Sequence, residues 1–164
     1  MPMRILVISD THGELGNFLK VMDIEKKVDL CVHLGDIEGQ ENEIADLVSC
    51  PLFAVRGNND FFSPLPYDID VKIGPYQAFL THGHHYGISV GEGGVLEEAR
   101  ARGANLVMFG HTHRPVLREE EGIILVNPGS ISYPRQEDRK PSYMIITINE
   151  RNGKAEFEQK FLKS

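Results

Sequence analysis

The stretch LVMFGHTH, residues 106–113, joins an apolar run to two histidines that stand one residue apart. The run has the length of a buried strand, and Gly110 separates it from His111 and His113. Four other apolar runs of strand length lie at residues 5–8, 30–32, 52–55 and 78–80. Because unbroken apolar runs are typical of strands covered on both faces, the pattern predicts a layered α/β fold.

Three helices are predicted between these runs. The first has apolar residues at helical spacing, namely Leu15, Phe18, Leu19 and Met22. The second has an apolar face of Ile44, Leu47 and Val48 and stops before Pro51. The third covers residues 95–101 and ends near Gly103.

The last third of the chain has a different pattern. Apolar segments 116–118 and 123–126 flank a turn containing Gly122, which predicts a hairpin, and residues 143–148 predict another strand. Asn152-Gly153 favours a two-residue hairpin turn before the alternating segment 155–161. We therefore expect βαβα order first and mainly antiparallel strands later, within a single α/β sandwich domain of two mixed sheets, residues 1–164.

The composition is that of an ordinary globular protein. Of its 164 residues, 41% are hydrophobic and 25% are charged, with a formal net charge of −7. This charge argues against an extended nucleic acid partner, which would require a basic face. No apolar run approaches the roughly 20 residues that span a bilayer. Cys31 and Cys50 lack metal-binding spacing, which together with the absence of a signal peptide predicts a cytoplasmic protein.

Residues able to bind a metal follow all five apolar runs. The five segments are SDTHG (9–13), HLGD (33–36), RGNND (56–60), THGHH (81–85) and GHTH (110–113). In open α/β sheets, ligands bind beyond the carboxyl ends of the strands. If the runs are neighbouring strands, their polar side chains meet at one place.

Each segment taken alone has an ordinary structural interpretation. Asp10 could cap the helix that follows it, and Asp36 after Gly35 is typical of a turn. Asn58 and Asn59 are also frequent turn residues, and a lone buried histidine is more often hydrogen-bonded than metal-bound. Turn chemistry alone does not explain why five separate runs all end in oxygen and nitrogen donors, so the joint pattern favours a metal site.

The types of ligand indicate the metal and its chemistry. Carboxylate, amide oxygen and imidazole suit Mn, Fe, Zn or Co ions, and thiolate has no part in the set. The set is too large for one tetrahedral ion, whereas two ions that share a carboxylate would use it. Such a pair, roughly 3.5–4 Å apart, stabilises the attacking and leaving oxygens of an in-line displacement and yields hydroxide near neutral pH. The pair would stay cationic, which indicates a phosphate ester as substrate.

The motifs Asp-x-His, Gly-Asp, Gly-Asn-x-Asp, Thr-His-Gly-His and Gly-His-Thr-His, in this order, resemble those of the calcineurin-like metallophosphoesterases. The runs VRGNND, THGHHYG and NPGSIS are most similar to their small prokaryotic phosphodiesterase branch. The resemblance implies a four-layer sandwich of two mixed β-sheets flanked by helices. It also implies phosphodiester hydrolysis by a hydroxide bridging two divalent ions, with Mn expected and Zn, Fe, Ni or Co as alternatives.

The same resemblance implies a ligand set. One ion would be bound by Asp10, His12, Asp36 and His113, and the other by Asp36, Asn58, His82 and His111. Asp36 would bridge the two ions. The expected catalytic residues are Asp36, Asn58, Asn59 and His82.

Position 59 departs from the pattern of many relatives, which have a histidine after the metal-binding asparagine. Asn59 cannot supply a proton near neutral pH, so we expect activated diesters to be cleaved and unactivated monoesters to be poor substrates. Asp60 would then only orient the loop. Asn59, His84 and Arg114 are the expected substrate-binding residues, and His84 could also hold a metal ligand in place.

Residues around the motifs allow more than one interpretation. His33 is expected to be structural and hydrogen-bonded, and Arg56, like Arg114, could meet phosphate or simply face solvent. The loop at 127–130, NPGS, could position phosphate or form a plain turn. Phe61-Phe62 could form an apolar wall for the substrate, although burial in the core is the favoured expectation.

Two other classes of function compete with the enzyme. One is a protein-interaction scaffold, as in the eukaryotic retromer subunit of this fold, whose metal site is degraded, and the other is a structural metal site. Every expected ligand position is filled in this chain, which favours the enzyme. The expected partner is a small phosphodiester, with no membrane association and a possible homodimer.

Overall fold

The computed structural model describes residues 2–163, and across these residues ten strands form two five-stranded sheets. Sheet A has the order β10-β9-β1-β2-β3. Its strands are β1 (Met3–Ile8), β2 (Leu30–His33), β3 (Leu52–Ala54), β9 (Ser142–Ile148) and β10 (Ala155–Phe161). β1, β2 and β3 are parallel, whereas β9 is antiparallel to both of its neighbours, so the sheet is mixed.

Sheet B has the order β4-β5-β6-β8-β7. Its strands are β4 (Asp68–Ile73), β5 (Tyr76–Thr81), β6 (Leu106–Met108), β7 (Pro115–Glu120) and β8 (Ile123–Pro128). The three central strands β5, β6 and β8 are parallel, and the edge strands β4 and β7 are antiparallel to them. Both sheets are therefore mixed, as expected.

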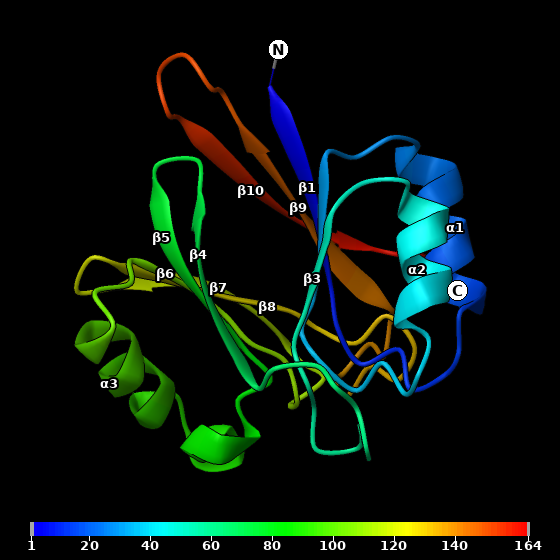
Figure 1. Ribbon diagram of the computed structural model, residues 1–164, viewed down its shortest axis with the longest axis horizontal. Coiled ribbons are helices and arrows are strands. Elements are labelled where there is room, and N and C mark those ends of the chain that lie inside the picture. Colours follow the sequence, from blue (N-terminus) through cyan, green and yellow to red (C-terminus); the bar gives the residue numbers. More distant parts are fainter. Residues whose placement is uncertain (1, 164) are drawn as a thin grey trace.

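Helices cover the outer faces of the two sheets (Figure 1). α1 (Gly16–Glu25) and α2 (Glu41–Val48) pack on sheet A, and α3 (Gly93–Ala101) packs on sheet B. Two short 3₁₀ turns, His84–Tyr86 and Ile88–Val90, connect β5 to α3. This arrangement confirms the four-layer sandwich.

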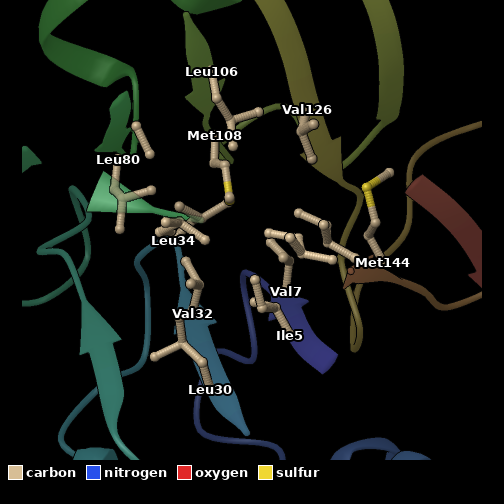
Figure 2. Close-up of a cluster of buried hydrophobic side chains, with 14 of the residues drawn as sticks. Ile5, Val7, Leu30, Val32, Leu34, Leu80, Leu106, Met108, Val126 and Met144 are labelled. Atoms are coloured by element: carbon tan, nitrogen blue, oxygen red, sulfur yellow. The ribbon is translucent and has the colours of Figure 1, made fainter. Parts of the chain in front are cut away.

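The main hydrophobic core lies between the two sheets. Figure 2 shows Val7 and Val32 of sheet A facing Met108 and Val126 of sheet B, and all four side chains are fully buried. Two smaller clusters join each sheet to its helices. Because both faces of the central strands are covered, their sequences are continuously apolar, which is the pattern that predicted them.

Three local expectations were wrong. Leu19 and Leu47 are 49% and 42% exposed, because the buried stripes of their helices are centred on other residues, Phe18 and Val21 in α1 and Ile44 in α2. The Asn152-Gly153 turn belongs to a longer connection between Ile148 and Ala155. A two-residue type I′ turn needs positive φ at both central positions, and here only Gly153 has it.

No helix within residues 2–163 combines the length and the apolar character that crossing a membrane requires.

Candidate metal centre

The five predicted ligand segments meet at one end of the molecule, although the runs before them belong to two sheets. β1, β2 and β3 are neighbours in sheet A, and β5 and β6 are neighbours in sheet B. Backbone hydrogen bonds join the loops within each sheet: Asp10 N–H donates to Gly35 O (3.0 Å) and Gly110 N–H donates to His82 O (3.2 Å). His111 N–H donates to Asp10 Oδ2 at 3.2 Å and connects the two groups of loops.

Four of the expected ligands form the first cluster, here called the Asp10 half: Asp10, His12, Asp36 and His113. One donor atom from each of the four lies within 4.8 Å of the others. His113 Nε2 is 3.3 Å from Asp10 Oδ1, and His12 Nε2 is 3.5 Å from Asp36 Oδ2. His12 Nε2 is also 3.2 Å from His113 Nε2. These spacings suit a single ion with four ligands.

The second cluster shares Asp36 with the first and is here called the Asn58 half: Asp36, Asn58, His82 and His111. His82 Nε2 lies 3.3 Å from Asp36 Oδ2 and 3.0 Å from Asn58 Oδ1. His111 Nδ1 lies 3.1 Å from Asn58 Oδ1 and 3.2 Å from His82 Nε2. All seven expected ligands thus face one region, and Asp36 Oδ2 stands between the two groups.

Hydrogen bonds on the outer sides of three rings determine which nitrogen faces the clusters. His82 Nδ1–H donates to Leu34 O and His113 Nδ1–H donates to Tyr133 O, both at 2.6 Å. His12 Nδ1–H donates to the Glu38 carboxylate at 3.0 Å. Because a carbonyl or carboxylate oxygen only accepts, each ring keeps a proton on Nδ1. Its Nε2 atom faces inward and can bind an ion when it carries no proton.

The clusters are therefore made of acceptors that face one another. In the Asp10 half, two imidazole lone pairs and two carboxylate oxygens converge, and Asp10 Oδ1 is buried without a hydrogen-bond partner among the described residues. Buried acceptors at such distances repel one another unless a proton or a cation lies between them. Oxygen and imidazole donors in this number fit divalent transition-metal ions.

The backbone at five candidate ligands is strained. Asp10, His12, Asp36, His111 and His113 all have φ between +48° and +71°. This left-handed conformation costs a non-glycine residue about 1–3 kcal/mol, and such strain concentrates at functional sites. These turns direct the donor side chains of each loop into the same centre. The placement of the donors therefore explains the strained backbone.

Close packing around Asp36 fixes the shared carboxylate. A Cβ at Gly57 would collide with the Asp36 carboxylate and backbone nitrogen, so only glycine fits there. Asn59 donates to the same carboxylate twice, from N–H at 2.9 Å and from Nδ2 at 3.1 Å. Asp60 accepts hydrogen bonds from the backbone N–H groups of Asp36, Glu38 and Gly57 at 2.7–2.8 Å, so it orients the loop as expected.

The loop at 127–130 also supports the ligands and is no plain turn. Asn127 Nδ2 donates to Gly110 O at 3.2 Å, and Ser130 Oγ donates to Asp10 O at 2.9 Å. Both residues are fully buried. They fix the segments that carry His111 and Asp10, so their effect on the centre is through backbone position.

The charges of the centre are strongly coupled. Burial alone would raise the pKa of Asp10, but the positive charge of His82 and the neighbouring imidazoles of His113 and His12 hold that pKa well below its usual range. Burial lowers the pKa of His82, yet Asp10 and Asp36 outweigh it and raise the value to about 9. The carboxylates are thus anionic near neutral pH and favour a positive charge among the imidazoles.

The remaining expected residues lie around the centre in different roles. His33 is fully buried, accepts from Gly35 N–H and bonds Thr11 Oγ1, so it is structural. The ring of His84 packs edge-on against the ring of His82, with 5.4 Å between the ring centres. Arg114 is exposed and forms no ion pair within residues 2–163. Arg56 is half-buried, donates to Asp60 O and lies over a tyrosine ring, so it does not simply face solvent.

The expectation that Phe61 and Phe62 are buried was wrong. They are 73% and 99% exposed, because Phe62 occupies a left-handed turn (φ 59°) that directs the chain outward after Asp60. Sequence reasoning also missed Glu38 and Tyr133, which hold His12 and His113. Glu38 follows a ligand by two residues without a motif, and Tyr133 acts through its backbone oxygen, which no side-chain pattern records.

Comparison with known proteins agrees with this geometry. The family model of the calcineurin-like phosphoesterase superfamily domain matches residues 3–151. The chain belongs to this family. It is 36% identical over 149 residues to a probable metallophosphoesterase, YsnB, of Bacillus subtilis, an alignment that covers 89% of this chain and 85% of the relative. It is 31% identical over 150 residues to the phosphodiesterase MJ0936 of Methanocaldococcus jannaschii, covering 77% and 83% of the two chains.

A solved structure supports the same fold. The Vps29 protein of Entamoeba histolytica, crystallised in complex with Zn²⁺, superposes with a TM-score of 0.77 at 21% identity. The match covers 97% of this chain and 99% of Vps29. Together with the sequence relatives, it confirms the metallophosphoesterase fold. The family, its relatives named as phosphodiesterases, and the cluster of Asp and His residues support a metal-dependent hydrolase.

Proposed function

We propose that this protein is a phosphodiesterase that uses two divalent metal ions, one in each half of the centre. Asp10, His12 and His113 would hold one ion, Asn58, His82 and His111 the other, and Asp36 would bridge them. The proposal depends above all on Asp36 Oδ2, which lies 3.5 Å from His12 Nε2 and 3.3 Å from His82 Nε2. One carboxylate oxygen thus faces both halves at once.

When bound, such ions lower the pKa of a bound water and balance the charge that develops on the phosphoryl oxygens. The protein's own contribution is to hold the donors in place. Leu34, Tyr133 and Glu38 keep three imidazoles in the tautomer that a metal requires. Two carboxylates do not balance two divalent ions, so the site attracts an anionic diester. Mn is the proposed ion, with Zn, Fe, Ni or Co as alternatives.

Asn59 is proposed to act on the centre and on substrate selection. Its amide and its backbone N–H both donate to Asp36, which keeps the bridging carboxylate in one orientation. No imidazole stands at this position to protonate a leaving group. Diesters with activated leaving groups are therefore the proposed substrates, and unactivated monoesters are expected to react poorly. His84 and Arg114 stay candidate substrate-binding residues.

A second candidate function, a protein-interaction scaffold, has the Vps29 likeness in its favour. That likeness, at 21% identity, concerns the fold only. The filled set of ligand positions favours the enzyme, because a scaffold has no need of strained turns that aim donors inward.

The test is hydrolysis of bis(p-nitrophenyl) phosphate by protein that has been treated with a chelator, with and without added Mn²⁺, together with metal analysis. The enzyme predicts turnover that disappears on chelation and returns with Mn²⁺. A scaffold predicts protein without bound ions or with ions that do not support turnover. A structural site predicts bound ions, no turnover, and unfolding when the ions are removed.

Substitution of position 59 tests the proposed selectivity. Asn59→His supplies a proton donor, so the rate on phenyl phosphate, an unactivated monoester, should rise by up to about 100-fold relative to the rate on bis(p-nitrophenyl) phosphate. The parent protein, assayed on both esters, is the reference. An unchanged ratio of the two rates would contradict the assigned effect of Asn59.

A further inference from the structure

A cavity of about 590 Å³ opens beside the Asp10 half. His12 and His113 form its inner wall, and Tyr133, Arg135 and Arg139, from the loop between β8 and β9, form its outer wall. No donor of the Asn58 half lines it. The cavity thus adjoins the Asp10 half of the centre and not the Asn58 half.

The arginines of this cavity differ from most others in the chain. Arg4, Arg100, Arg102 and Arg118 each form an ion pair with a carboxylate. Among the described residues, the guanidinium groups of Arg135 and Arg139 form neither an ion pair nor a hydrogen bond. In a protein of net charge −7, two arginines that line one cavity and form no ion pair with the described residues are available for an anion.

Nearby acidic groups offset only part of this charge. Glu38 also lines the cavity and contributes one negative charge, and its carboxylate accepts the hydrogen bond from His12 Nδ1. Asp138 accepts from the Lys140 N–H, and neither Asp138 nor its neighbour Glu137 lines the cavity. The arginines therefore supply most of the charge that faces this space.

The outer wall is fixed to the centre by its backbone. His113 Nδ1–H donates to Tyr133 O at 2.6 Å, and Arg135 N–H donates back to His113 O at 3.1 Å. Tyr133 N–H also donates to Ser130 Oγ at 2.7 Å. The arginine-bearing segment and a candidate metal ligand thus have a defined relative position, as a substrate subsite requires.

Two residues that line the cavity, Glu38 and Tyr133, accept hydrogen bonds from the two histidines. His12 and His113 direct their Nδ1 atoms to Glu38 and Tyr133, while their Nε2 atoms point to the centre. An anion held by Arg135 and Arg139 is therefore distinct from the phosphate that would meet the ions. Tyr133 lines the cavity and also contacts the centre, because its ring lies 5.5 Å from that of His12; 47% of its surface is exposed.

We propose that this cavity is a subsite for a second phosphate of the substrate, bound by Arg135 and Arg139, with Tyr133 packing on the ring system that links the two phosphates. The proposal rests on the phosphodiesterase function above and narrows its substrate class to diesters in which one esterified group is a phosphorylated, nucleoside-like unit. Two guanidinium groups in one cavity suit a phosphate because each of them can donate parallel hydrogen bonds to its oxygens.

Two chromogenic diesters differ by this phosphate alone: thymidine 5′-(p-nitrophenyl phosphate) with and without a 3′-phosphate. With the Mn²⁺-supplemented parent protein, the 3′-phosphate should raise kcat/KM by about tenfold, as expected for charge-assisted hydrogen bonds. The double variant Arg135→Gln/Arg139→Gln should lose this gain while its rate on the simpler diester changes less than about twofold. Arg151→Gln, an exposed arginine on the β9–β10 connection, is the matched control and should retain the gain.

Equal rates of the parent on both diesters would overturn the subsite. Equal losses of the double variant on both diesters would also overturn it, because the arginines would then serve the reacting phosphate. Both arginines are exposed, and an unchanged melting temperature would show that the double variant is folded.

Calorimetric binding provides a readout that does not depend on turnover. Thymidine 3′,5′-bisphosphate should bind the parent about tenfold more tightly than thymidine 5′-monophosphate does, both without metal and with Mn²⁺. The double variant should bind the two nucleotides with equal affinity. If the parent cleaves neither diester yet shows this difference, the phosphodiesterase function is wrong and the subsite stands. If the parent cleaves both diesters at equal rates and binds both nucleotides equally, the subsite is wrong and the enzyme stands.

Discussion

The two halves of the centre share Asp36 but differ in how firmly their donors are held. In the Asp10 half, Asp10 is fully buried and both histidines have their outer nitrogen fixed, by Glu38 and by Tyr133. In the Asn58 half only His82 is fixed in this way. Asn58 is exposed, and among the described residues His111 Nε2 has no hydrogen-bond partner.

This difference indicates how two ions at one centre acquire unequal affinities. Donors that are held before binding lose less conformational freedom when an ion arrives, so the ion binds more tightly. We therefore expect the Asp10 half to bind its ion first and the Asn58 half to exchange its ion more readily.

The largest effect is expected from the residue that both halves share. Asp36→Asn removes the charge that faces both ions, a loss of several kcal/mol, and should lower kcat/KM on bis(p-nitrophenyl) phosphate by about 1000-fold. Metal analysis of the purified variant should show fewer bound metal ions per protein molecule than in the parent. Asp46→Asn, an exposed carboxylate on α2, is the control and should behave as the parent does. Parent-like rates for Asp36→Asn would exclude a shared carboxylate.

A smaller effect is expected from a change that is confined to the Asp10 half. Glu38→Gln weakens the acceptor that holds His12, and the loss of such a partner lowers metal affinity about 10–100-fold. Calorimetric titration with Mn²⁺ should show the tighter of the two binding steps weakened and the other unchanged. Glu43→Gln, on the exposed face of α2, is the matched control. Equal weakening of both steps would contradict the separation into halves.

The smallest effect concerns pH and assigns a proton to the Asn58 half. The pKa of His82 is raised to about 9, above its usual 6.5, so the proton on His82 stabilises metal-free protein below about pH 6.5. That stabilisation is lost as the pH rises toward 9. A bound ion replaces the proton, so the gap in melting temperature between Mn²⁺-loaded and metal-free protein should widen by a few degrees from pH 6.5 to 8.5. A constant gap would count against this assignment.

The sequence was most informative where burial was complete. The runs that became β1, β2, β5 and β6 are covered on both faces and could be recognised as continuous apolar segments. β4, at the edge of sheet B, was missed because it contains no continuous apolar run. In DIDVKI, residues 68–73, polar and apolar residues alternate, which is the signal of a half-covered strand.

The candidate ligands could be named from their chemistry, but not the arrangement that brings them together. Their convergence followed from the sequence only on the condition that the five runs are neighbouring strands, whereas the runs belong to two sheets whose loops meet at one end. The missed residues Glu38 and Tyr133 depend on a loop conformation with positive φ and on a backbone contact, respectively. Those features come from tertiary packing and leave no periodic pattern. Phe61 and Phe62 likewise show that hydrophobicity alone does not determine burial.

The most direct test is anomalous diffraction at the manganese absorption edge, from crystals of this protein grown with Mn²⁺. Two peaks are predicted, one among the donors of the Asp10 half and one among those of the Asn58 half, each next to the Asp36 carboxylate. A single peak, or two peaks that do not both contact Asp36, would contradict a centre of two ions that share this residue.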